Sequence, residues 1–399
     1  MIHRSSEHPF MESPFERRIE ACKRRLTAEG ADLVVCFPSP NLTYLTGFEE
    51  SPSERHLLLF VPRDGDPAIV APAMYEAQLS ELPIPDLERR FWTDADDPLE
   101  AIETVIDGYS LAGEIEEPPT VLVDDRMWAT FTQDLRDLCP EAAFGLAGTV
   151  LEPLRIRKDA VELETLRRAG AVADRVALEI RERGTDLIGT TEAELATEID
   201  RLLAAEGGEE PAFETIVAAG PNGAQPHHHS GSREIQNGDS VVLDFGAFVA
   251  ADLEGSAATA IGRYPGDQTR TIVVGDEPPA AYERVHETVR EAQNAAVEAV
   301  EPGVTAGAVD RAAWSVIEDA GYGDAFIHRT GHGVGLEVHE PPYIAAGNDR
   351  ELEPGMVFSI EPGIYLEGEF GVRIEDLVAV TEDGAEQLND TPRGWATGQ

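Results

Sequence analysis

Along the first 150 residues, apolar positions follow helical and strand-like spacings in turn. Residues 15–29 have the spacing of an amphipathic helix that ends at Gly30, and an apolar, strand-like run follows at 31–37. After a Pro/Asn turn, the pattern predicts strands at 57–61, 68–71 and 120–123 and a helix near 74–82. This alternation predicts a small α/β domain over residues 1–150.

The remainder, residues 151–399, shows two groups of elements in the same order of helix, helix and strands. Residues 146–157 lead into the first long helical pattern, for which Asp159 is the expected N-cap. The first group has helices at 159–183 and 191–205, then strands at 213–219, 240–250 and 268–274. The second has helices at 280–299 and 305–320, then strands near 327–330, 355–364 and 371–381. We therefore expect a second domain built from two similar halves.

Length and composition agree with a globular protein of two domains. The chain has 399 residues, 42% of them hydrophobic, which is enough for a sizeable core. It has no run of about 18 apolar residues, and residues 1–18 are polar, with no apolar segment before a cleavage site. These features predict a soluble, cytoplasmic protein with no membrane partner. The three cysteines, Cys22, Cys36 and Cys139, are widely separated, so we expect no disulfide framework.

The charge balance excludes one class of partner. The formal net charge is −45, from 76 acidic and 31 basic residues, and the only lysines are Lys23 and Lys158. Nucleic acid is therefore not expected to bind. An acidic excess spread over the whole chain resembles that of proteins from organisms that live in molar salt, and it predicts stability that depends on salt.

Two acidic residues stand beside apolar strands in the first half. Asp244 follows three apolar residues, and Asp267 precedes the strand at 268–274. A buried carboxylate needs a cation or hydrogen bonds, and two of them side by side on paired antiparallel strands would repel. For Asp244 alone, an aspartate that caps a turn at the strand end is an equal alternative.

The second half repeats this arrangement with glutamates. Glu361 and Glu375 each stand among apolar, strand-like residues. An exposed strand edge or an ion pair is the alternative for each of them, and Glu375 could pair with neighbours of Arg373 across the sheet. Four carboxylates at matched positions of two halves favour a metal site instead.

A glycine-rich segment carries candidate histidines, His332 and His339. Its glycines leave the imidazoles accessible. A phosphate loop does not fit, because the segment lacks the G-x-G-x-x-G spacing and no Lys-Ser/Thr follows. A zincin is excluded, because neither His339-Glu340 nor His286-Glu287 is followed by a second histidine three residues on.

Three adjacent histidines, His227, His228 and His229, lie in a loop between strands. They cannot all face one ion, so we expect at most one of them in the site. Four carboxylates and one imidazole suit two divalent ions that activate a water molecule. Such an oxygen-rich set favours manganese, with cobalt, zinc and iron as alternatives.

Taken together, these residues resemble the pita-bread metallopeptidases, which include Xaa-Pro dipeptidase (prolidase), Xaa-Pro aminopeptidase and methionine aminopeptidase. The motifs are FETIV at 213–217 with PH at 226–227, LDFG at 243–246, DQTRT at 267–271, GHGVG at 331–335 with HE at 339–340, SIEPG at 359–363 and RIED at 373–376. Residues 40–48, PNLTYLTGF, resemble the creatinase-type N-terminal domain, which favours the proline-directed members.

The resemblance implies an α/β (α+β) fold, with a creatinase-like N-terminal domain and a C-terminal pita-bread domain whose curved antiparallel sheet has pseudo-twofold symmetry. It implies a metal-bridging hydroxide that cleaves the bond preceding proline in a small peptide, and a homodimer that forms through the N-terminal domain. By motif, the metal ligands are Asp244, Asp267, His332, Glu361 and Glu375. Glu361 also accepts a proton, and His227 and His339 contact the substrate and the tetrahedral intermediate.

Some alternatives stay open on the same scaffold. They are a carbon–sulfur lyase, an amidinohydrolase-like enzyme and a peptide-binding module that is not an enzyme. The preference for a dipeptide or a longer peptide is also open. The gap between Asp244 and Asp267 is longer than in the family and Gly266 replaces the usual small polar residue, so we expect residues 251–265 to form a loop at the pocket rim.

Overall fold

The computed structural model describes residues 13–109, 118–252 and 260–397. The chain divides into two compact units, Met1–Arg155 with Asp252–Gly262, and Ile156–Ala251 with Arg263–Gln399. Within the described part, no helix is both long and apolar enough to cross a bilayer. Cys22, Cys36 and Cys139 are free thiols.

A mixed, six-stranded sheet of described residues forms the centre of the first unit, in the order β4-β3-β2-β1-β5-β6. Its β1 pairs antiparallel with β2 and parallel with β5. The strands are β1 (Leu33–Cys36), β2 (Leu58–Pro62), β3 (Ala68–Pro72), β4 (Glu88–Trp92), β5 (Thr120–Val123) and β6 (Ala143–Leu146). The helices are α1 (Pro14–Glu29), α2 (Pro40–Thr46), α3 (Glu76–Ser80), α4 (Pro98–Gly108), α5 (Ala129–Leu138) and α6 (Gly148–Arg155). The predicted α/β character is therefore confirmed.

One element of this unit differs from the prediction. The expected Pro/Asn turn is wrong, because α2 occupies the segment. The Ser39 side chain accepts hydrogen bonds from the backbone N–H groups of Asn41 and Leu42, and Pro40 takes the first helical position, where no N–H is needed. Gly47 then ends the helix in the left-handed region, with φ 75°. A Ser-Pro-Asn sequence fits a helix start as well as a turn.

The first half of the second unit has helices α7 (Ala160–Arg183) and α8 (Glu192–Ala205) and a three-stranded antiparallel sheet in the order β11-β8-β7. The strands are β7 (Ile216–Ala219), β8 (Ser240–Phe245) and β11 (Gln268–Val273). Asp159 caps α7 as predicted, in a capping box with Glu162.

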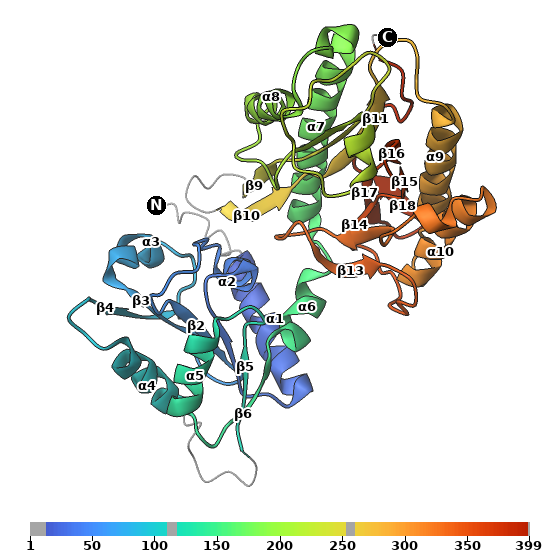
Figure 1. The fold of residues 1–399 in the computed structure, drawn as a ribbon. Helices are drawn as coiled ribbons and strands as arrows, with labels where there is room; N and C mark the ends of the chain where they lie inside the picture. Colours follow the sequence, from blue (N-terminus) through green and yellow to red (C-terminus); the bar gives the residue numbers. More distant parts are fainter. Residues whose placement is uncertain (1–12, 110–117, 253–259, 398–399) are drawn as a thin grey trace, which may run out of the picture. The chain divides into compact units, whose positions relative to one another are not determined.

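The second half has helices α9 (Tyr282–Glu298) and α10 (Ala306–Asp319) and a described sheet in the order β13-β12-β14-β17-β18. Its strands are β12 (Gly331–Gly333), β13 (Glu340–Ile344), β14 (Val357–Ile360), β17 (Asp376–Val380) and β18 (Ala385–Gln387). β15 (Gly363–Leu366) and β16 (Phe370–Arg373) form a separate antiparallel pair. Figure 1 shows α7 and α8 in green and α9 and α10 in orange, with strands between the two helix pairs. The repeated order of helix, helix and antiparallel strands is confirmed.

Strand boundaries in the second half correct the prediction. The strand expected near 327–330 begins only at Gly331, and the strand expected at 355–364 is divided into β14 and β15 at Glu361 and Pro362. The strand expected at 371–381 is likewise divided into β16 and β17, at Ile374 and Glu375. Pro362 cannot donate a ladder hydrogen bond, which accounts for the first break. Both glutamates therefore lie at strand breaks and not within strands.

The segment 251–265 also differs from the expected loop. β9 (Phe248–Asp252) and β10 (Ala260–Pro265) form a two-stranded sheet, whereas residues 253–259 lie outside the described residues. The described part of this segment is thus a strand pair.

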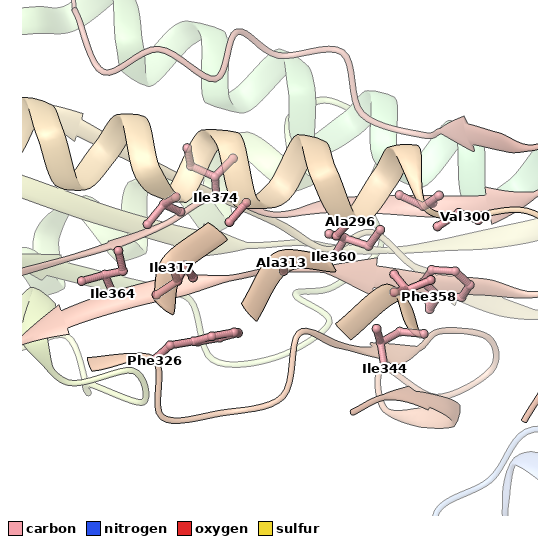
Figure 2. Packing of buried hydrophobic residues seen from close by; sticks show 14 of the residues in the cluster. Ala296, Val300, Ala313, Ile317, Phe326, Ile344, Phe358, Ile360, Ile364 and Ile374 are labelled. Atoms are coloured by element: carbon pink, nitrogen blue, oxygen red, sulfur yellow. The ribbon is translucent and has the colours of Figure 1, made fainter. Parts of the chain in front are cut away.

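Apolar side chains fix the helices of the second half against its strands. Ala296 of α9 and Ile317 of α10 pack in one cluster with Phe358 of β14 and Ile364 of β15, and all four are fully buried (Figure 2). Burial of a side chain as large as Phe358 stabilises the fold by about 1.5–3 kcal/mol. This packing supports the strands whose ends carry the glutamates.

Candidate metal centre

A cavity of about 420 Å³ lies within the second unit and is lined by residues of both halves. All the residues predicted to bind metal or substrate line it, namely Asp244, Asp267, His332, Glu361, Glu375, His227 and His339. The described residues of the segment 251–265 contribute nothing to this lining.

Three buried side chains in this cavity could together hold a metal ion. Asp267, His332 and Glu375 each offer a ligand atom, and these atoms all lie within 4.8 Å of one another. The Nε2 atom of His332 lies 3.7 Å from Oδ2 of Asp267 and 3.4 Å from Oε1 of Glu361. Side chains from just before β11, from β12 and from the break after β14 thus lie close together.

Strand pairing brings Asp244 to the same place. β8 and β11 pair antiparallel with Asp244 opposite Thr269, two residues after Asp267. Oδ2 of Asp244 accepts a hydrogen bond of 2.6 Å from Arg373, whereas its buried Oδ1 has no hydrogen-bond partner among the described residues. A buried carboxylate oxygen of this kind is costly unless a cation or donor reaches it.

Burial also shifts the protonation of the carboxyl groups. It raises the pKa of Asp267 well above 3.8, and the charges of Asp244 and Glu361 raise it further. Burial and the charge of Asp267 likewise raise the pKa of Glu375 well above 4.5. The pKa of Glu361 rises to about 7, mainly because of burial. Without a metal ion, these carboxyl groups keep their protons to a higher pH than usual. A bound cation would displace those protons.

The histidine of the cluster stays neutral. Burial, helped by the neighbouring His339, lowers the pKa of His332 to about 3. A neutral imidazole can offer a nitrogen lone pair to a metal. Carboxylates that repel one another, an unpartnered oxygen on Asp244 and a neutral imidazole therefore fit divalent cations.

Hydrogen bonds connect the carboxylates of each half to the other half. Thr269 of the first half donates a bond of 2.6 Å to Oε2 of Glu375 in the second half. Arg373 of the second half donates one to Asp244 of the first. Arg373 also donates to the hydroxyl groups of Thr269 at 3.1 Å and of Tyr365 at 2.9 Å. Ser359 donates a longer bond of 3.3 Å to Oε1 of Glu361.

Sequence reasoning missed the roles of Arg373 and Tyr365. Arg373 appeared only as a neighbour of Glu375, although an arginine inside an apolar strand is a signal for a buried acidic partner. The Tyr365 hydroxyl also lies 2.9 Å from Nε2 of His328, which lines the cavity as well. Nothing in the local pattern distinguishes Tyr365 from a core tyrosine.

The three adjacent histidines differ in their surroundings. Nε2 of His228 lies 2.8 Å from Oε2 of Glu192, a buried carboxylate at the start of α8. Nδ1 of His229 lies 2.9 Å from Glu214, and its side chain is 83% exposed. Burial lowers the pKa of His339, and the charges of Arg329 and then His227 lower it further. All three histidines line the cavity, so the expectation that at most one of them lies in the site is wrong.

Comparison with known proteins identifies this architecture. The sequence pattern of Metallopeptidase family M24 matches residues 164–382, and that of the Creatinase/Prolidase N-terminal domain matches residues 18–157. The chain belongs to this metallopeptidase family. The prediction of a metallopeptidase with a creatinase-type N-terminal domain is therefore confirmed, and a divalent metal requirement comes with the family.

Several members of the metallopeptidase family are similar over most of their length. A protein named probable dipeptidase PepE from Mycobacterium tuberculosis is 40% identical over 380 residues, 95% of each chain. One named Xaa-Pro dipeptidase from Lactobacillus helveticus is 38% identical over 359 residues, 88% of this chain and 91% of its own. The solved prolidase from Thermococcus sibiricus has a TM-score of 0.86 and 37% identity, covering 97% of this chain and 100% of its own.

Proposed function

We propose that this metallopeptidase hydrolyses the peptide bond that precedes proline, as an Xaa-Pro dipeptidase or Xaa-Pro aminopeptidase. The observation that carries the proposal is the meeting of four carboxylates and one neutral imidazole in a cavity of about 420 Å³, a volume suited to a small peptide. Relatives named dipeptidase or Xaa-Pro dipeptidase support the dipeptide form.

We assign the metal site to Asp244, Asp267, His332, Glu361 and Glu375, which would hold two divalent ions. Manganese suits this oxygen-rich set, with cobalt, zinc and iron as alternatives. When bound, the ions supply Lewis-acid polarisation of the scissile carbonyl and lower the pKa of the attacking water.

Residues of the chain supply the proton transfers and the positioning. Glu361 lines the cavity beside the other candidate ligands, where its carboxylate could take a proton from the attacking water. Ser359 donates to Oε1 of Glu361, so we assign the transferred proton to Oε2. Burial lowers the pKa of His339, which as a neutral imidazole donates one N–H to the developing oxyanion. His227 contacts the substrate from the opposite half.

Further parts of the proposal concern the whole protein. We propose a cytoplasmic homodimer that forms through the N-terminal unit, adapted to high salt. A net charge of −45 repels itself at low ionic strength, and molar salt screens that repulsion. Light scattering that gives a monomer mass would contradict the dimer, and a melting temperature unchanged between dilute buffer and molar potassium chloride would contradict the adaptation.

Three peptides test the activity. Protein loaded with manganese is incubated with an Xaa-Pro dipeptide, a tripeptide that contains Xaa-Pro and a Met-Ala peptide. We expect cleavage of the Xaa-Pro dipeptide, and cleavage of the tripeptide would identify an aminopeptidase. Glu361→Gln should lower kcat by about 10²–10⁴. Full activity of this variant would disprove the role of Glu361. No cleavage of any peptide under any of the four metals would favour the lyase or the peptide-binding module.

A further inference from the structure

A buried ion pair lies one residue from His339 and outside the cavity wall. Nζ of Lys158 lies 2.7 Å from Oε1 of Glu340, and the two side chains are 1% and 4% exposed. Neither residue lines the cavity. Two charges lose much of their hydration on burial, so a buried ion pair need not stabilise the fold. A role other than stability is therefore considered for this pair. It also uses one of the only two lysines in the chain.

Glu340 belongs to the hairpin that carries both His332 and His339. β12 and β13 pair antiparallel with Gly333 opposite Glu340, so residues 334–339 close the hairpin. A side chain at Gly335 would overlap the Glu340 carboxylate, which therefore packs against the inside of this connection. The backbone N–H of Gly335 donates to the carbonyl of Glu337 at 3.0 Å. The carboxylate thus lies where the chain turns from one histidine to the other.

Lys158 is itself held by the backbone of a neighbouring segment. Its N–H donates to the carbonyl of Gly355 at 2.8 Å, and Arg157 pairs with Met356 in an antiparallel bridge. Met356 directly precedes β14, the strand that ends before Glu361. The Lys158 ammonium is therefore presented from a fixed backbone and not from a free surface side chain.

We propose that Lys158 is a positioning residue that acts through Glu340 to hold His339 in place. The rings of His339 and His332 lie edge to face, with centroids 4.0 Å apart and an interplanar angle of 74°. Tethering Glu340 restricts the backbone of the residue before it, and a displacement of about 1 Å can cost about 10² in rate. This inference rests on the proposed function, in which His339 donates to the oxyanion.

A double-mutant cycle separates this role from a merely structural ion pair. Lys158→Met, His339→Ala and the double variant are compared for kcat and KM on an Xaa-Pro dipeptide, together with metal content and melting temperature. We expect Lys158→Met to lower kcat by about 10–100-fold with little change in KM or metal content. In the His339→Ala background the same substitution should change kcat less than about threefold, because its effect passes through His339.

Arg157→Met is the matched control. Arg157 lies next to Lys158 and pairs with Glu353 at 3.1 Å, but the two side chains are 54% and 53% exposed. Loss of this exposed pair should leave kcat unchanged within about twofold. An equal loss of kcat in Arg157→Met would show a general disturbance of the segment and overturn the inference.

Lys158→Met removes the cation that pairs with the buried Glu340 carboxylate and can prevent folding. The double variant Lys158→Met with Glu340→Gln removes both charges and therefore provides a second measurement. We expect this pair of substitutions to give a folded protein whose kcat stays low. Full kcat in that protein would overturn the inference but not the proposed function. Effects of Lys158→Met and His339→Ala on kcat that simply multiply would do the same. An unchanged kcat in His339→Ala would overturn the proposed role of His339 and, with it, the role of Lys158.

Discussion

The two halves of the second unit use the same elements but supply different chemistry to one cavity. The first half contributes Asp244 within β8 and Asp267 directly before β11, on two paired strands. The second contributes Glu361 and Glu375, which lie at strand breaks, and His332 within β12. Asp267 and Glu375 each directly precede a strand, whereas Asp244 lies within β8 and Glu361 directly follows β14. One pair of matched positions therefore shares its backbone setting, and the other pair does not.

Each half also donates hydrogen bonds to candidate metal ligands of the other half. Arg373 of the second half donates a hydrogen bond to the carboxylate of Asp244 in the first, and Arg270 of the first half donates one to the backbone carbonyl of Glu375 in the second. Thr269 of the first half bonds to Glu375 of the second. Each half thus holds a carboxylate of the other, so neither half can be expected to form a competent site by itself.

The largest expected effect tests whether both halves are needed for metal. Asp267→Asn removes a charge from the first half and Glu375→Gln removes one from the second. We expect each variant to lose bound metal and to lose kcat by several orders of magnitude, because both side chains belong to the buried group whose ligand atoms all lie within 4.8 Å of one another. Elemental analysis and peptide hydrolysis measure the two losses. Asp276→Asn, a substitution of an exposed aspartate, is the control. Retention of full metal content by either buried variant would show that the carboxylates of one half are enough to bind the metal.

Removal of the arginine between the halves should have the next largest effect. Arg373→Met leaves Asp244 buried without its cationic partner, which costs about 3–5 kcal/mol in the metal-free protein. Bound cations should recover part of this loss. Urea unfolding with and without metal measures both values. Arg167→Met breaks a half-exposed pair with Glu386 and should cost about 1 kcal/mol or less. A similar cost for the two variants would mean that Arg373 does not connect the halves.

Hydroxyl groups allow a finer comparison. Thr269→Val removes the bond of 2.6 Å to Glu375, and Ser359→Ala removes the bond of 3.3 Å to Glu361. We expect Thr269→Val to weaken metal affinity by about 10–100-fold, as removal of a group that orients a ligand commonly does. The longer bond of Ser359 predicts a smaller loss for Ser359→Ala. Competition with a chelator measures both affinities, and a reversed order would show that support within one half outweighs support across halves.

The sequence predicted the helix pairs well, because their apolar spacing is set by burial on a helix face. In the first half, the strand predicted at 240–250 is divided into β8 and β9, and the strand predicted at 213–219 begins only at Ile216. Asp244 and Asp267 could be placed together since the runs beside them were long enough to pair. The breaks at Glu361 and Glu375 were not predicted. Pro362 and Gly363 are a sequence signal for the first break, whereas apolar residues continue on both sides of the second. Local apolarity shows burial, but it does not show where a strand leaves its neighbour.

The candidate site shows the same limit. Its acidic residues and His332 were named from local setting and resemblance, whereas Arg373, Thr269 and Tyr365 support the ligands through contacts distant in sequence. The bond from Arg373 to Asp244 spans 129 residues. Such a partner can be found only when the two halves are folded together. The helix α2 was missed for a local reason, since Ser39 and Pro40 begin a helix as readily as a turn.

The smallest expected effect, counted per proton, is the pH dependence of metal binding, to which the halves contribute unequally. In the metal-free protein the pKa of Glu361 is raised by burial to about 7, and those of Glu375 and Asp267 are raised well above their usual values. Carboxylates bind metal without their protons, so metal binding must release protons below these pKa values. Affinity should therefore fall as the pH drops below about 7, by about tenfold per unit for each proton released. Calorimetry in buffers of different ionisation enthalpy counts the protons, and Glu361→Gln should release fewer than the unmodified protein. If Glu361→Gln releases as many protons as the unmodified protein, the protons come from Asp267 and Glu375. The second half would then release no more protons than the first.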